Sequence, residues 1–163
     1  MKKREHTISG LVRNTPGGLF KIAEVFAKER INIKSLAVGG TEDDELTRMT
    51  IVVYDEEAKI QLAEEKIKKL KEVELFDDLT REGFIDRELL LIKVSTDNET
   101  TSQIMQIVEI FRANVVGVGN TTMTIEVAGE EEKINGLIKL LKPFGIKSIA
   151  RTGKIALKRS DEV

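Results

Sequence analysis

The chain has 163 residues and a mass of 18.3 kDa, which suits one medium domain or two small ones of roughly 75–80 residues each. Its 26 Lys and Arg residues face 28 Asp and Glu residues, and the resulting net charge of -2 provides no basic field to steer nucleic acid. Because the chain contains no cysteine, disulfides, thiolate metal sites and thiol catalysis are excluded.

The first half of the chain predicts the order strand, helix, strand, strand, helix, strand. Strand patterns cover residues 6–13, 32–38 and 48–54, with a shorter one at 73–79. Apolar residues at one-face spacing predict helices over 16–30 and 56–71. At the start of the first helix we expect Thr15 to be the N-cap and Pro16 to be the first helical residue.

The second half repeats this order after a polar interval at 80–83. It predicts strands over 88–94, 115–118 and 123–127, helical faces over 104–111 and 134–141, and final strand material within 146–157. The repeat indicates an α+β chain of two ferredoxin-like βαββαβ domains, each with an antiparallel sheet and helices on one face. We expect the domains to cover 1–80 and 81–163.

The chain shows no targeting or membrane segment that we can recognise. The basic start, Met1 to Arg4, is followed by a strand pattern rather than an apolar run, and no stretch approaches the length needed to cross a bilayer. We therefore expect a soluble cytoplasmic protein.

Residues with catalytic or metal-binding chemistry are scarce. The single histidine, His6, lies near the chain start, where we expect a solvated side chain. The acidic run Asp43 to Glu45 lacks the ligand spacing of a calcium loop, and no dinucleotide or Walker pattern surrounds Gly17 and Gly18. Aromatic residues make up 4%, too few for the stacking platform of an RNA-binding sheet. We predict no catalytic and no metal-binding residues.

The turn Asn14-Thr15-Pro16-Gly17-Gly18-Leu19 is the best candidate for a binding site. It joins a strand pattern to a helical one, and its glycines leave the backbone N–H groups of the helix start uncovered. Such a helix start can receive a carboxylate or a phosphate. The alternative is a well-made helix start without a ligand, and Asn32 could likewise be only a polar residue entering an edge strand.

Several segments together resemble the ACT domain and the following domain of the acetolactate synthase small subunits. The first three are Asn14 to Leu19, Arg30 to Leu36 and Leu46 to Ile51. The resemblance continues through Arg87 to Val94, Glu109 to Ala113, Pro143 to Ile146 and Ala150 to Gly153, in order along nearly the whole chain.

This resemblance implies a regulatory subunit without catalysis of its own. Its partner would be a catalytic large subunit that carries thiamine diphosphate, magnesium and FAD, and the small subunit would activate it and confer feedback inhibition by valine. The effector residues implied by the family are Asn14, Gly17, Gly18, Leu19, Asn32 and Ile33. Two alternatives are a stand-alone ACT module that regulates another enzyme and an enzyme in its own right.

The predicted topology adds a statement about assembly. The first and second strands run parallel, so the end of one and the start of the other lie at opposite ends of the sheet. Asn14 and Asn32 of one chain should therefore be far apart, and they can share a ligand only if they come from different chains. We predict a homodimer with effector sites across its interface, two by symmetry.

Overall fold

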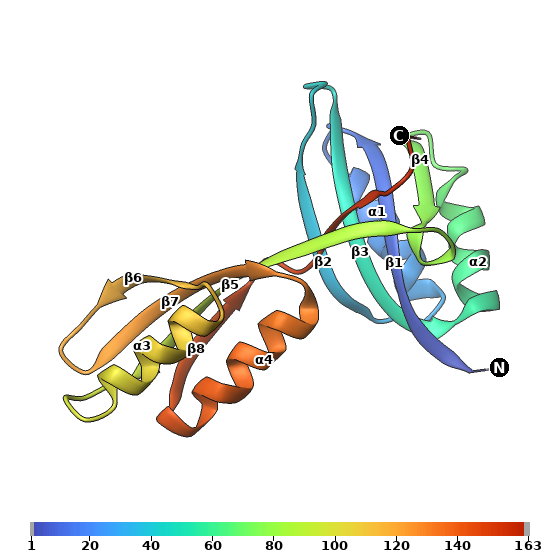
Figure 1. The fold of residues 1–163 in the computed structure, drawn as a ribbon. Helices are drawn as coiled ribbons and strands as arrows, with labels where there is room; N and C mark the ends of the chain where they lie inside the picture. Colours follow the sequence, from blue (N-terminus) through green and yellow to red (C-terminus); the bar gives the residue numbers. More distant parts are fainter. Residues whose placement is uncertain (1, 162–163) are drawn as a thin grey trace. The chain divides into compact units, whose positions relative to one another are not determined.

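The computed structural model describes residues 2–161 and divides them into two compact units (Figure 1). The first unit contains the described residues up to Asp86 together with those from Lys154 onward, and the second contains Arg87–Gly153. This division differs from the expected ranges 1–80 and 81–163, because the last strand hydrogen-bonds to the first unit. The backbone N–H of Ala156 donates to the Thr50 hydroxyl at 3.2 Å, for example.

The first unit has the predicted βαββαβ order. Its elements are β1 (Lys3–Arg13), α1 (Gly18–Lys28), β2 (Ile33–Gly40), β3 (Leu46–Glu56), α2 (Glu57–Ile67), β4 (Val73–Asp78) and the short 3-10 helix η1 (Leu79–Arg81). The sheet has the order β2-β3-β1-β4 with every pair antiparallel. Both helices pack on one face of this sheet, so the predicted fold class is confirmed for this unit (Figure 1).

The core of the first unit lies between the sheet and the two helices. Alternate residues of β1 and β3 meet one apolar face of each helix, as the patterns of period 2 and 3.6 predict. The buried cluster includes Ile8, Val12, Ile22, Phe26, Met49, Ile51, Ile60, Ala63, Ile67 and Phe76.

The second unit repeats the arrangement with its own core. Its elements are the main part of β5 (Phe84–Ser95), α3 (Thr101–Ile110), β6 (Asn114–Val118), β7 (Thr122–Gly129), α4 (Glu131–Leu141), the 3-10 helix η2 (Lys142–Phe144) and β8 (Ile146–Arg151). The sheet order β6-β7-β5-β8 corresponds to that of the first unit. None of the helices within residues 2–161 is long and apolar enough to cross a membrane.

The last strand, β9 (Ile155–Lys158), pairs with β5 and belongs to the first unit. The buried side chain of Ala156 alternates along this strand with Ile155 and Leu157, which are 59% and 56% exposed. The large apolar side chains of β9 therefore remain more than half exposed in the unit that holds it.

Candidate functional site

The turn between β1 and α1 is held in place by hydrogen bonds to the loop between β2 and β3. The backbone N–H of Asn14 donates to the Glu45 carbonyl at 2.7 Å, and its side-chain Nδ2 donates to the Asp44 carbonyl at 3.2 Å. The side-chain oxygen of Asn14 has no partner within the described chain, and the residue is exposed. An exposed amide oxygen held in this way can accept a hydrogen bond from a ligand.

The helix itself begins two residues later than the sequence predicted. Gly17, not Thr15, is the N-cap, and neither Thr15 nor Pro16 is helical. Gly17 has φ of 90° and ψ of -7°, a left-handed conformation that a residue without Cβ adopts at little cost. Because the turn is made by backbone geometry, no side chain caps this helix.

The two glycines of the turn serve different purposes. A Cβ on Gly17 would meet nothing within 4 Å, so the space above the turn is open. Gly18 is buried, and a Cβ there would lie 3.3 Å from Cγ1 of Val12 and 3.6 Å from the Arg13 carbonyl oxygen. Gly18 thus lets the helix start pack directly on β1, while Gly17 keeps its outer side accessible.

Unpaired backbone donors face this open space. The first helical hydrogen bond runs from the N–H of Lys21 to the Gly17 carbonyl at 3.1 Å. The N–H groups of Leu19 and Phe20 precede it and have no acceptor within residues 2–161. Leu19 and Phe20 are also 42% and 68% exposed, so donors and apolar surface lie side by side. This combination suits a small ligand with a carboxylate and an apolar group.

Glu72, at the entry to β4, is a neighbour of the turn that the sequence did not indicate. Its carboxylate pairs with the Lys21 ammonium, and this contact lowers the pKa of Glu72. Its side chain lies 3.9 Å from the position of a Cβ on Gly18. Because Lys21 neutralises Glu72, the carboxylate does not cancel the positive end of the helix dipole.

The predicted site residues fall into two groups at opposite ends of the sheet. Arg13, the last residue of β1, pairs with Leu46 on β3, whereas Ile33 pairs with Val53. Seven residues of extended β3 separate these partners, a span of about 23 Å. Asn14, Gly17, Gly18 and Leu19 therefore lie together, and exposed Asn32 and half-buried Ile33 of the same chain lie far from them.

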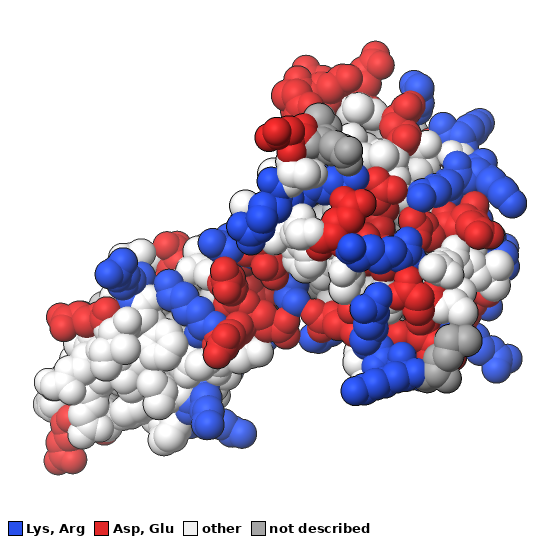
Figure 2. All heavy atoms as spheres, turned by 45° about the vertical axis from the view of Figure 1, so that its right-hand side comes forward, with Lys and Arg blue, Asp and Glu red and all other residues white. Residues whose placement is uncertain are grey.

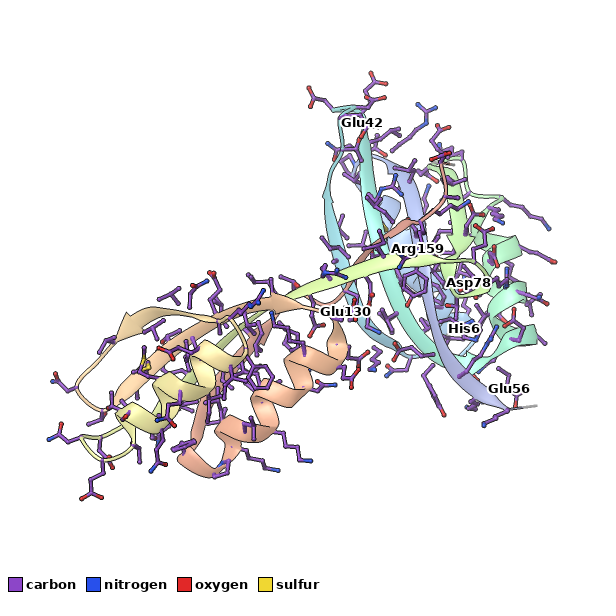
Figure 3. All side chains as sticks on the ribbon, viewed as in Figure 1. His6, Glu42, Glu56, Asp78, Glu130 and Arg159 are labelled. Carbon is purple, nitrogen blue, oxygen red and sulfur yellow. The ribbon has the colours of Figure 1, made fainter. Side chains whose placement is uncertain are left out.

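His6 lies in a buried polar network, so the prediction of a solvated side chain was wrong. β1 begins at Lys3, which places His6 inside the sheet and on the same side as core residue Ile8. His6 is 0% exposed, and its Nδ1 lies 2.7 Å from Oδ2 of Asp78 at the end of β4 (Figure 3). The burial depends on residues 72 positions apart, which no local pattern reveals.

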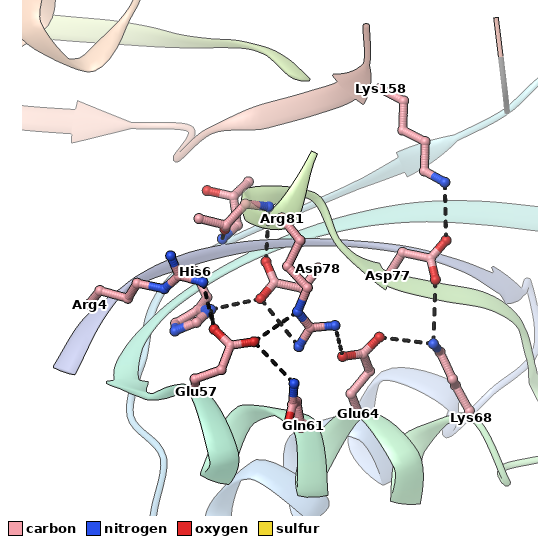
Figure 4. A network of polar contacts seen from close by, with 12 residues as sticks. Arg4, His6, Glu57, Gln61, Glu64, Lys68, Asp77, Asp78, Arg81 and Lys158 are labelled. Atoms are coloured by element: carbon pink, nitrogen blue, oxygen red, sulfur yellow. Dashed lines mark hydrogen bonds and ion pairs between the residues drawn. The ribbon is translucent and has the colours of Figure 1, made fainter. Parts of the chain in front are cut away.

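The geometry around His6 also resembles that of a metal site. Ligand atoms of His6, Glu57 and Asp78 lie within 4.8 Å of one another. However, Arg4 binds Glu57 at 2.6 Å, and Arg81 binds the same carboxylate at 2.8 Å (Figure 4). Both guanidinium groups lower the pKa of Glu57, and they take the place beside it that a cation would need. The network therefore joins β1, α2 and η1 as a structural element.

Comparisons with known proteins agree with the resemblance. A family model described as the AHAS small subunit-like ACT domain matches residues 8–74, and one described as the small subunit of acetolactate synthase matches residues 87–160. The acetolactate synthase small subunit of Aquifex aeolicus is 44% identical over 96% of this chain and 82% of its own length. The probable acetolactate synthase small subunit of Archaeoglobus fulgidus is 40% identical over 97% of this chain and 99% of its own.

A solved structure supports the same relationship in three dimensions. The crystal structure of the acetolactate synthase small subunit from Thermotoga maritima aligns with a TM-score of 0.87 at 38% identity. The alignment covers 97% of this chain and 99% of that one, so both units are matched.

Proposed function

Because this chain belongs to the family of acetolactate synthase small subunits, we propose that it makes a catalytic large subunit sensitive to valine in branched-chain amino acid biosynthesis. The observation that carries the proposal is the open helix start at Gly17 and Gly18 beside a fixed Asn14. Valine bound there would inhibit the complex by favouring one of its conformations over another.

The chemistry of valine fits the groups at this turn. Its carboxylate would accept from the N–H groups of Leu19 and Phe20 at the positive end of α1. Its ammonium would donate to the side-chain oxygen of Asn14. Its branched side chain would pack on Leu19, which is exposed beside the turn. We expect a second chain to supply the apolar wall on the opposite side of the ligand.

A homodimer formed through β2 would complete the site. β2 is an edge strand, so its outer N–H and C=O groups can pair with another strand. Antiparallel pairing of two β2 strands about a two-fold axis brings the start of one β2 to the sheet end where the partner's β1 finishes. Asn32 and Ile33 of one chain would then face Asn14 of the other, giving two equivalent valine sites.

We assign catalysis to the large subunit with its thiamine diphosphate, magnesium and FAD, and activation to contact with this chain. The second unit offers apolar surface for such a contact, because Ile110 and Val118 are 73% and 75% exposed. On the face shown in Figure 2 this unit has a broad uncharged area, whereas charges of both signs cover the first unit.

Reconstitution with the large subunit tests the proposal. Acetolactate formation should rise when this chain is added and fall again with valine. Asn14→Ala should weaken the inhibition and leave activation unchanged, since Asn14 lies in the turn rather than in the second unit. Lys28→Gln, which removes an exposed charge from the far end of α1, is the control. No complex in a pull-down, or normal valine inhibition of the Asn14 variant, would contradict the proposal.

A further inference from the structure

A pocket of about 170 Å³ opens on the sheet face opposite α1 and α2. Its floor consists of residues that alternate with the core residues Ile8, Met49 and Phe76, so their side chains point away from the helices. β9 supplies the remaining wall. The lining includes Ser9, Arg48, Leu75, Asp77, Leu157 and Lys158.

Arg48 gives the pocket an uncompensated positive charge. Its guanidinium is half-buried and donates from Nη1 to the Ser9 hydroxyl at 3.0 Å. Within residues 2–161 the Ser9 hydroxyl is the side-chain partner of Arg48, and Arg48 forms no ion pair with an acidic residue. A guanidinium carries five N–H donors, so most of those of Arg48 are available to a ligand. A partly desolvated cation of this kind is stabilised by an anion that accepts two hydrogen bonds.

The acidic residue of the pocket does not neutralise Arg48. Asp77 lies 3.4 Å from Nζ of Lys68 through one oxygen and 3.4 Å from Nζ of Lys158 through the other (Figure 4). Both oxygens thus face ammonium groups of the protein already. The single negative charge of Asp77 is thus shared between Lys68 and Lys158, and the charge of Arg48 remains in excess, so a further cation is disfavoured here. The pocket therefore favours an anion without an amino group.

The other walls select for apolar character. Leu75 lies on β4 beside Asp77, and Leu157 comes from the returning strand β9. The volume is below the range of about 300–1,000 Å³ typical for larger ligands, so the ligand must be small. We propose that this pocket binds a small aliphatic carboxylic acid, with its carboxylate on Arg48 and its carbon chain between Leu75 and Leu157.

This carboxylate pocket is separate from the turn at Asn14. Ser9 precedes Asn14 by five residues along extended β1, a distance of about 16 Å. The turn offers N–H donors and an amide oxygen to an amino acid, whereas the pocket offers a guanidinium and leucine side chains. The two sites therefore differ in the ligand class they select, and a loss of binding at one site need not change binding at the other.

Calorimetric titration of isovalerate, which has the carbon skeleton of valine without the amino group, into the full chain tests the proposal. Two matched substitutions on β9 spare the fold, because both side chains are more than half exposed. Leu157→Asp places a negative charge at the pocket and should weaken isovalerate binding at least tenfold. Ile155→Asp adds the same charge outside the pocket lining and should leave binding within twofold of the wild type.

Arg48→Gln should weaken isovalerate binding at least tenfold as well, with Arg112→Gln in the second unit as its control. Asn14→Ala should leave isovalerate binding unchanged, which separates this proposal from the valine site. Absence of isovalerate binding at millimolar concentration, equal effects of the two β9 substitutions, or displacement of isovalerate by inorganic phosphate at equal concentration would overturn the proposal.

Discussion

Replacing Gly17 by aspartate and by asparagine tests the valine site at its open side. The two side chains have nearly the same shape, and both have room at their first atom, because a Cβ on Gly17 has nothing within 4 Å. Both variants carry the same backbone cost at φ of 90°, on the order of 1 kcal/mol, since Asn and Asp tolerate left-handed conformations best. Any difference between them therefore reports the charge.

The size of that difference follows from Coulomb's law. Two unit negative charges about 5 Å apart repel by about 3 kcal/mol at an effective dielectric constant of about 20. Gly17→Asp should thus bind valine on the order of 100-fold more weakly than Gly17→Asn. Calorimetric titration of valine measures both affinities, and denaturant unfolding checks that the two variants are equally stable. Equal valine affinities would refute the placement of the ligand carboxylate at this helix start.

Three further substitutions test the architecture. Gly18→Ala should lower the free energy of unfolding by about 1–2 kcal/mol, because its Cβ would press on Val12 at 3.3 Å; denaturant titration measures this loss, and an unchanged midpoint would contradict the close packing. Asp78→Ala leaves Nδ1 of buried His6 without this hydrogen-bond partner and should cost about 1–3 kcal/mol, seen as a lower thermal midpoint that Asp78→Asn partly restores. Asp55 has its pKa lowered from 3.8 to about 2, chiefly by a hydrogen bond from Lys59, so its stabilisation is complete above about pH 5 and is lost as the pH falls through 2. Asp55→Asn should therefore lower stability near pH 7 and have a much smaller effect near pH 2, as acid titration of the unfolding midpoint would show.

The order of elements in both units was predictable from the sequence, because apolar residues recur with the period of the element they belong to. The pattern fixes the strands where one face is buried, as at Leu90, Ile92 and Val94 in β5. It fails at strand ends, where polar or charged residues interrupt the alternation. β1 accordingly starts at Lys3 and β5 at Phe84, both earlier than the patterns indicated.

Features that depend on distant contacts were not predictable. The burial of His6 depends on its contact with Asp78. The N-cap at Gly17 depends on a left-handed backbone conformation, whereas Thr15 and Pro16 are residue types that favour an earlier helix start. The sequence pattern also does not show that β9 returns to the first unit. The large apolar side chains of this strand are more than half exposed, so the alternation of Ile155 with Ala156 gives no indication of which sheet it joins.

Mixed dimers test most directly whether valine sites are shared between two chains. One chain carries Asn14→Ala and the other Asn32→Ala, with different affinity tags so that only mixed dimers are purified. If each site takes Asn14 from one chain and Asn32 from the other, one site loses both residues and the second site is intact. Calorimetry should then find half the wild-type number of valine sites, at wild-type affinity. If no site of wild-type affinity is found, each chain forms its own site and the shared interface is contradicted.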